Sequence, residues 1–239
     1  MWKGAAVCAA LIALPADAGE VCVAGDGGVI ARACYVDDAP PTGYDHAILG
    51  AVPEWDALRV YPSTGTARVV RPDHGFFEDI APHVADLTGD GLPEIIVVQT
   101  DLTKGARLMV LSAAGKVLAA TGYYGQPHRW LAVAGAGDFD GDGRTEIAYV
   151  DRPHLARELV FVRLEAGQLR EVARLTGMTN HRIEDSAISG GVRNCGHGDE
   201  VIVASADWGR VMAARIGQVA DLGAYSPKRM AAALRCEER

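Results

Sequence analysis

The sequence predicts an all-β protein, a small β-propeller of about four blades with four antiparallel strands in each. Short apolar and β-branched runs, bounded by Gly, Asn and Asp, occupy most of the 239 residues. The pattern of these runs repeats about every 50 residues, which is typical of propeller blades. A β-sandwich is the alternative, but it does not explain why an acidic loop recurs in the same register.

The blades are expected at 28–72, 76–123, 128–176 and 181–225, followed by a C-terminal tail at 226–239. A first strand, at 30–36, 80–85, 130–136 and 182–189, leads into a loop that ends in an acidic residue. Three more strands follow, at 46–49, 58–61 and 67–70 in the first unit, 95–98, 107–111 and 116–119 in the second, 147–150, 159–162 and 169–172 in the third, and 201–204, 210–213 and 218–222 in the fourth. No Pro/Ser-rich linker divides the units, so residues 19–239 are expected to form one domain. The tail is expected to hold a short helix.

Residues 1–18 are typical of a secretory signal peptide. Lys3 gives a positive start, residues 4–14 are apolar and small, and Ala16-Asp17-Ala18 offers a cleavage site. The protein is therefore expected to be secreted or periplasmic. The apolar run is too short to cross a bilayer and no later run reaches 18 apolar residues, so an integral membrane protein is not expected. A retained membrane anchor is the alternative.

Cysteine usage agrees with export, because four cysteines remain after the predicted signal: Cys22, Cys34, Cys195 and Cys236. Four cysteines allow three pairings. We favour Cys22–Cys34 with Cys195–Cys236, since each bond would fasten one end of the chain locally. Pairing of Cys22 with Cys236 and of Cys34 with Cys195 is the alternative.

The balance of charges limits the class of partner. The chain has 31 acidic and 23 basic residues, a formal net charge of -8. A nucleic-acid-binding protein normally carries a basic patch and a basic isoelectric point, so nucleic acid is not an expected partner.

Two acidic loops predict two Ca²⁺ sites. Asp138-Phe-Asp-Gly-Asp-Gly-Arg-Thr-Glu146 and Asp86-Leu-Thr-Gly-Asp-Gly-Leu-Pro-Glu94 space their oxygen ligands at alternate positions. Neither is an EF-hand, because position 12 counted from Asp138 is Tyr149, not Glu, and a strand follows the loop. The ligands expected in the third unit are Asp138, Asp140, Asp142, the carbonyl of Arg144, and Glu146; those in the second unit are Asp86, Thr88, Asp90, the carbonyl of Leu92, and Glu94.

The second of these sites is expected to bind calcium more weakly, because Thr88 replaces a carboxylate. The corresponding loops of the outer units, 37–45 and 192–200, have lost most of their acids and are not expected to bind calcium well. A binding-free Asp/Gly turn is the alternative for either acidic loop. The calcium is expected to be structural, since neither loop offers a general base or a clear place for a substrate.

The two loops and the strands after them, Gly137–Ala148 and Ala85–Ile96, resemble the FG-GAP/VCBS repeat family. Members of this family are calcium-binding propeller repeats of secreted bacterial proteins and integrin heads. The resemblance therefore implies a calcium-binding propeller. It is strong in the second and third units, whereas the outer units match only in period and strand pattern.

A second set of residues is expected on the face opposite the calcium loops. His74, His128 and His181 are 54 and 53 residues apart, each just before or within the segment that leads into a blade. Three interpretations remain open: a repeated structural hydrogen bond, a ligand site for an anionic group or a sugar, and a three-histidine metal site. Other residues expected on this face are Arg129, Asp151, His154, Arg157, Arg182 and Trp208.

The function predicted from these patterns is that of an exported, calcium-binding, non-enzymatic module for a protein or carbohydrate partner. No Walker A, G-x-S-x-G or H-E-x-x-H motif occurs. The alternatives are a lectin, a lyase or hydrolase acting on glycans through the histidine face, and a structural domain of an envelope assembly. A pocket with a histidine and a carboxylate within hydrogen-bond reach would favour the enzyme.

Overall fold

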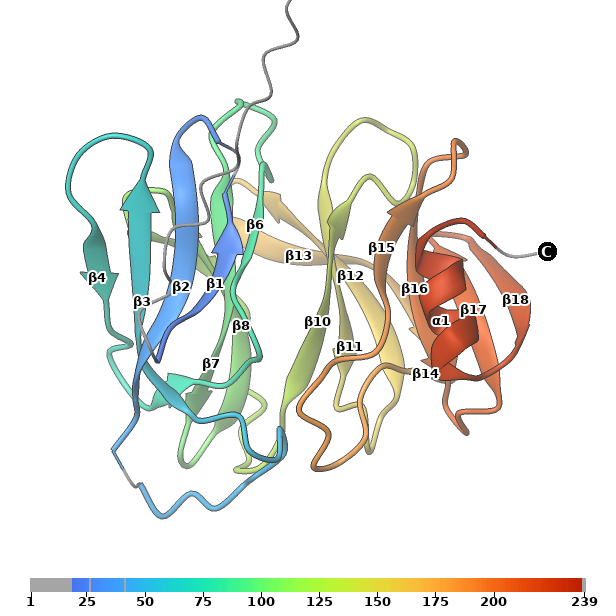
Figure 1. Ribbon diagram of the computed structural model, residues 1–239, viewed down its shortest axis with the longest axis horizontal. Coiled ribbons are helices and arrows are strands. Elements are labelled where there is room, and N and C mark those ends of the chain that lie inside the picture. The colour runs from blue at the N-terminus through green and yellow to red at the C-terminus, as the bar shows by residue number, and fades with distance from the viewer. Residues whose placement is uncertain (1–18, 26, 41, 238–239) are drawn as a thin grey trace, which may run out of the picture.

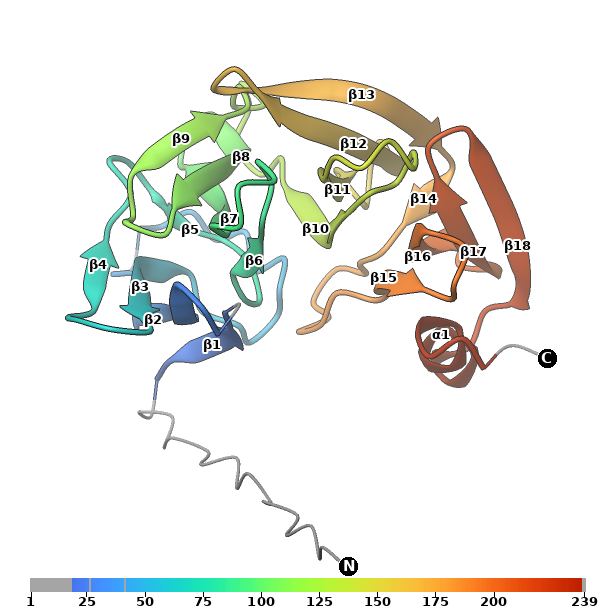
Figure 2. The same ribbon diagram turned by 90° about the horizontal axis from the view of Figure 1, so that it is seen from above.

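The computed structural model describes residues 19–25, 27–40 and 42–237, and the predicted signal peptide at 1–18 lies outside them. The described residues form 18 β-strands and one α-helix, which confirms the all-β class. The strands pair antiparallel in sheets of nine, four and five strands. The sheets stand side by side in an arc (Figures 1 and 2).

The nine-stranded sheet contains the first two units of the sequence. Its first group runs in the order β1-β2-β3-β4 and its second in the order β6-β7-β8-β9. The short strand β5 pairs with both β3 and β7 and so joins the groups. The strands are β1 (Val21–Ala24), β2 (Ile30–Asp38), β3 (Trp55–Pro62), β4 (Arg68–Val70), β5 (Phe76–Phe77), β6 (His83–Ala85), β7 (Glu94–Asp101), β8 (Gly105–Ser112) and β9 (Val117–Ala120).

The third and fourth units form the two smaller sheets, in the orders β10-β11-β12-β13 and β14-β16-β17-β18, with β15 also pairing with β16. Their strands are β10 (Leu131–Gly137), β11 (Glu146–Asp151), β12 (Glu158–Glu165), β13 (Gln168–Thr176), β14 (Met178–Thr179), β15 (Gly191–Asn194), β16 (Asp199–Ser205), β17 (Arg210–Arg215) and β18 (Gln218–Ala224).

The core lies between neighbouring groups of strands. On β7, Ile96 and Val98 pack toward β10 and β11, while Ile95 and Val97 pack toward β2 and β3. Side chains alternate across a strand, so a continuous apolar run such as Ile95–Val98 is what a strand covered on both faces requires. The second strand of the third unit repeats this pattern, because Tyr149 and Val150 enter different clusters.

Two of the expected strands are wrong. Residues 46–49 form turns rather than a strand, and 182–189 contain no strand, because β15 begins only at Gly191. The first unit instead begins with β1, which pairs with β2 and was not expected. Consequently most of the 37–45 segment lies in the connection from β2 to β3, whose described residues, 39–40 and 42–54, lie on the face opposite the two acidic loops, at the bottom of Figure 1.

Two disulfides fasten the ends of the described chain, and both match the favoured pairing. Cys22–Cys34 links a directly opposed pair on β1 and β2. Cys195–Cys236 links the β15–β16 loop to the end of the helix α1 (Pro227–Leu234), which confirms the helix expected in the tail. Ser226 caps α1 by accepting the N–H of Arg229 at 3.1 Å. Among the described residues, no helix has the length and apolar character needed to cross a membrane.

Candidate functional site

The loop between β10 and β11 is held in shape by its own first aspartate. The carboxylate of Asp138 accepts the N–H groups of Gly141 at 2.7 Å and of Gly143 at 3.0 Å. Both glycines have φ near +80°, a region that side chains disfavour. Phe139 points inward, is 0% exposed and packs against Phe161 with ring centroids 5.2 Å apart. The loop is therefore anchored in the core through its second residue.

Carboxylate oxygens of Asp138, Asp140 and Glu146 lie within 4.8 Å of one another in this loop. Burial raises the pKa of Glu146, and the N–H of Phe139, which donates to it at 3.0 Å, works against that rise. Such converging oxygens are the donor set that a hard cation such as Ca²⁺ uses. The residues of this loop thus fit the ion that their spacing predicts.

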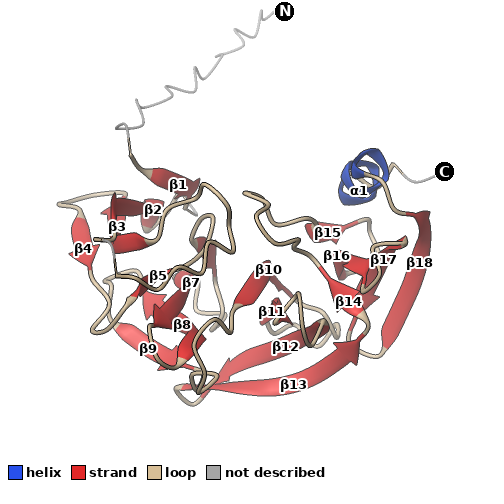
Figure 3. Ribbon diagram, turned by 90° about the horizontal axis from the view of Figure 1, so that it is seen from below, coloured by secondary structure: helices blue, strands red, loops and turns tan. Residues whose placement is uncertain are grey.

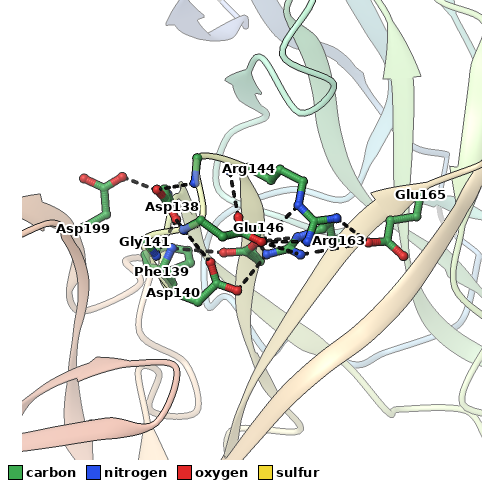
Figure 4. Close-up of polar contacts among 11 residues, drawn as sticks. Asp138, Phe139, Asp140, Gly141, Arg144, Glu146, Arg163, Glu165 and Asp199 are labelled. Carbon is green, nitrogen blue, oxygen red and sulfur yellow. Dashed lines mark hydrogen bonds and ion pairs between the residues drawn. The ribbon is translucent and has the colours of Figure 1, made fainter.

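A basic residue enters the same cluster from the neighbouring strand (Figure 4). Arg163 on β12 lies opposite Glu146, is 5% exposed, and donates from Nε to Glu146 Oε1 at 2.6 Å. It also donates to Asp140 Oδ2 at 2.9 Å and lies 3.1 Å from Asp142. This contact was not expected from the sequence, although an arginine on the strand opposite the closing acid is a signal that could have indicated it.

The remaining predicted ligands of this loop make their own contacts. Hydrogen bonds from the Arg144 side chain lower the pKa of Asp142 to about 2. Asp142 is not part of the group of converging oxygens. The N–H of Asp138 donates to Asp199 of the fourth unit at 2.9 Å, so a neighbouring loop supports this one.

The loop between β6 and β7 has the same backbone hydrogen bonds as the loop between β10 and β11, but its charged side chains differ. Asp86 accepts the N–H groups of Gly89 and Gly91 at 2.8 Å, and Glu94 accepts that of buried Leu87 at 2.9 Å. Among the described residues, however, the acids of this loop do not form a group within 4.8 Å. Ser112 stands opposite Glu94, where the third unit has an arginine. The two loops are therefore not equivalent.

A cavity of about 440 Å³ lies between the two loops, which the sequence analysis did not expect. Its lining includes Thr88 from one loop, Arg144 from the other, and Arg163 and Glu165 from β12. The expectation that neither loop offers a clear place for a substrate stays a prediction, and this cavity is the space next to the loops that bears on it.

In the outer units, the described residues form no loop with this acidic pattern. Glu200, the closing acid of the fourth unit, accepts from Arg193 Nε at 3.0 Å. In the first unit the true counterpart is the β1–β2 connection, whereas the 37–45 segment lies on the opposite face.

A pocket of about 240 Å³ opens on that opposite face, which Figure 3 shows from below. We call it the histidine pocket; it is lined by His46, Ile48, His128, Trp130, Arg152, Pro153, His154, Leu155 and Ile183. It gathers residues from the 39–54 segment, the chain leading into β10, the β11–β12 loop and the chain leading into β15. Of the predicted face residues, His128 and His154 line it.

The three equally spaced histidines do not come together. His181 is 1% exposed and lies beside the pocket, where its Nε2 donates to the carbonyl of Asp185 at 2.8 Å. His74 is exposed, and its carbonyl accepts from Gln99. Among the described residues no three histidines bring their ring nitrogens within 4.8 Å of one another. The interpretation of these residues as a three-histidine metal site is therefore not supported.

Most of the other predicted residues of this face make contacts outside the pocket. The guanidinium of Arg182 lies 4.0 Å from the ring centre of Trp208. Asp151 accepts from Arg152 at 2.7 Å and from Arg174 at 3.0 Å. Arg129 donates to the adjacent carbonyl of His128 at 3.3 Å, and Arg157 is exposed.

Two residues of this region were missed by the sequence analysis. His46 Nδ1 lies 2.6 Å from Glu78 Oε1, and Glu78 is 4% exposed. The Trp130 indole donates to the Glu78 carbonyl at 2.7 Å. His46 was assigned to a strand of the first unit, and only the position of the 39–54 segment brings it to Glu78.

Comparisons with known proteins agree with part of this description. Residues 86–149, which include both acidic loops, match the FG-GAP-like repeat, so the chain carries such a repeat. Comparison with curated proteins finds no match. Among solved structures, the rhamnogalacturonan lyase YesW is similar with a TM-score of 0.47 and 13% identity, over 87% of this chain and 51% of that one. The chain thus spans about half the length of that lyase.

Proposed function

We propose that the protein is an exported, calcium-binding β-propeller of four blades that works as a non-enzymatic binding module. Four successive groups of antiparallel strands, β1–β4, β6–β9, β10–β13 and β15–β18, support the propeller. A hydrogen bond from the Glu184 N–H to the Ile48 carbonyl, 3.1 Å long, links the first and fourth units. The two disulfides support an extracellular or periplasmic location.

The observation that carries the calcium proposal is the convergence of Asp138, Asp140 and Glu146 oxygens. Calcium there would be held by these carboxylates with Asp142 and the Arg144 carbonyl, and in the second loop by Asp86, Thr88, Asp90, Glu94 and the Leu92 carbonyl. The ion would offset the repulsion among carboxylates and so stabilise the fold. Its role is structural, since each loop is anchored in the core.

Thermal melts with calcium and with a chelator test this proposal. An ion that binds only the folded chain raises its stability by about 2.7 kcal/mol at 100 times Kd. We expect calcium to raise the Tm, and the double variant Asp138→Asn/Asp140→Asn to lose most of that rise. Asp207→Asn, which changes an exposed aspartate on the opposite face, serves as the control for loss of a surface carboxylate away from the loops. Identical melts with calcium and chelator would refute the proposal.

A glycan-active enzyme, a lyase or hydrolase, is the second candidate, and the His46–Glu78 contact favours it. A carboxylate that accepts from Nδ1–H leaves Nε2 as a possible general base. Incubation with polyuronates and neutral glycans, followed by assays of reducing ends and of unsaturated products, tests this candidate. If the wild type turns over a glycan and His46→Phe does not, the protein is an enzyme and not a non-enzymatic binding module.

A further inference from the structure

The ring of His46 is fixed in one orientation with one nitrogen unused. Its Nδ1–H donates to Glu78 at 2.6 Å, and the other oxygen of Glu78 accepts from the Thr100 hydroxyl at 2.6 Å. Nε2 has no hydrogen-bond partner among the described residues, and it is not a buried atom. Since the ring lines the histidine pocket, this nitrogen offers the pocket a fixed hydrogen-bond acceptor.

His128 provides a second acceptor of the same kind. Its Nε2 donates to the Tyr44 carbonyl at 2.7 Å, and its backbone N–H donates to the Tyr44 hydroxyl at 2.6 Å. In the neutral ring the remaining nitrogen, Nδ1, therefore carries a lone pair. The rings of His46 and His128 are stacked, with centroids 5.1 Å apart and planes at 13°.

The charges around the pocket do not favour an ionic ligand. Arg152 is paired with buried Asp151 through two hydrogen bonds, of 2.7 and 3.1 Å. Burial, with a smaller contribution from the His181 ring, lowers the pKa of His154 to about 4, so this ring is uncharged at neutral pH. The carboxylate of Glu78 is likewise engaged by His46 and Thr100, so neither sign of charge prevails at the pocket.

The walls between these polar groups are apolar. Ile48 and Pro153 are buried, whereas Leu155 and Ile183 are each 61% exposed at the pocket. Exposed large apolar side chains beside a cavity are a common feature of binding sites. The volume of about 240 Å³ corresponds to roughly eight waters, which is room for one ring but not for a chain of rings.

Backbone strain is concentrated at the same place. Asp45, Ala47, His128 and Arg152 all have φ between 41° and 56°, which costs energy for residues other than glycine. The first two flank His46, and the other two line the pocket. The fold therefore holds these side chains in a disfavoured backbone geometry that orients them around the cavity.

From these observations we propose that the histidine pocket binds one uncharged, hydroxyl-bearing ring of pyranose size. His46 Nε2 and His128 Nδ1 accept hydrogen bonds from its hydroxyl groups, and Leu155 and Ile183 cover its C–H face. Glu78 acts as a positioning residue that fixes the tautomer of His46. The inference rests on the proposed binding role and names the class of ligand.

The proposal is tested by titrating the calcium-loaded full chain with glucose, galactose, mannose and rhamnose, one at a time. NMR follows the histidine ring C–H signals and the tryptophan indole N–H signals. We expect at least one sugar to shift the signals of His46, His128 and Trp130 saturably. His46→Phe keeps the stacked ring but removes the acceptor, and should weaken binding at least tenfold. Glu78→Gln should weaken binding less and change the His46 ring signals in the free protein.

His74→Ala, which alters an exposed histidine outside the pocket, is the control and should bind as the wild type does. Absence of saturable shifts with every sugar would overturn the proposal, as would unchanged binding in folded His46→Phe. Tighter binding of galacturonate than of galactose would overturn the uncharged class. Calcium melts are scored separately, so loss of calcium stabilisation and loss of sugar binding remain distinguishable.

Discussion

Arg163 and Glu146 stand opposite each other on β12 and β11, and the arginine Nε donates to the buried carboxylate at 2.6 Å. A guanidinium thus supplies positive charge inside a loop whose acids predict a divalent cation. Calcium and Arg163 would together offset the negative charge of the four carboxylates in this loop. The loop of the second unit has no corresponding arginine, since Ser112 occupies that position.

Replacement of Arg163 should therefore make the third-unit loop more dependent on calcium. Removing one partner of a buried ion pair costs about 3–5 kcal/mol. We expect Arg163→Gln to lower the Tm strongly in chelator and less in calcium, so that the rise caused by calcium exceeds that of the wild type. Arg144→Gln, which removes exposed ion pairs to Asp142 and Glu165, is the control and should change stability little. An equal calcium response in wild type and Arg163→Gln would contradict the shared role.

Phe139 should be a major anchor of the same loop. Phe→Ala in a core typically costs about 3–5 kcal/mol, and this side chain is 0% exposed. We expect Phe139→Ala to lower the unfolding free energy by that amount, measured by urea denaturation in calcium. Leu92→Ala, at a residue of the other loop that is 50% exposed, should change it little. Similar losses in the two variants would show that the loop is not anchored through its second residue.

His154 should make stability depend on pH below its ordinary pKa. The folded-state pKa is about 4, lowered from 6.5 by burial and by His181, so the unfolded chain takes up a proton first as the pH falls. This group contributes no pH dependence above about 6.5, and it destabilises the fold progressively from there toward 4. We expect His154→Gln to lose less stability than the wild type between about pH 7.5 and pH 5. The readout is urea denaturation at each pH, with His74→Gln as the control; parallel curves for wild type and His154→Gln would contradict the prediction.

The two disulfides should contribute unequally. Cys195–Cys236 closes a sequence separation of 41 residues and Cys22–Cys34 one of 12. In the chain-entropy model a longer closed loop gives more stabilisation, within a typical range of about 2–4 kcal/mol. Cys195→Ser/Cys236→Ser should therefore lower the unfolding free energy more than Cys22→Ser/Cys34→Ser. The reverse order, measured by urea denaturation of both variants, would argue against loop closure as the main effect.

The sequence alone determined the parts of this protein that depend on local pattern. Continuous apolar runs such as Ile95–Val98 predicted strands buried on both faces, and the spacing from Asp138 to Glu146 predicted a tight acidic loop with a strand behind it. These features are local because strand periodicity and turn chemistry act between residues close in the chain. The favoured cysteine pairs were also predicted, since each joins an end of the chain to the unit beside it.

Only the tertiary structure decided which side chains that are distant in the sequence meet. Arg163 reaches the third-unit loop through strand register, and His46 reaches Glu78 because β1, rather than β2, begins the first unit. Because the first unit begins one strand earlier than expected, the 39–54 segment lies on the opposite face. His46 therefore lines a pocket for which the sequence had indicated other residues. These contacts join residues 17 and 32 positions apart, and their geometry depends on strand register and on how the sheets pack, which no local pattern records.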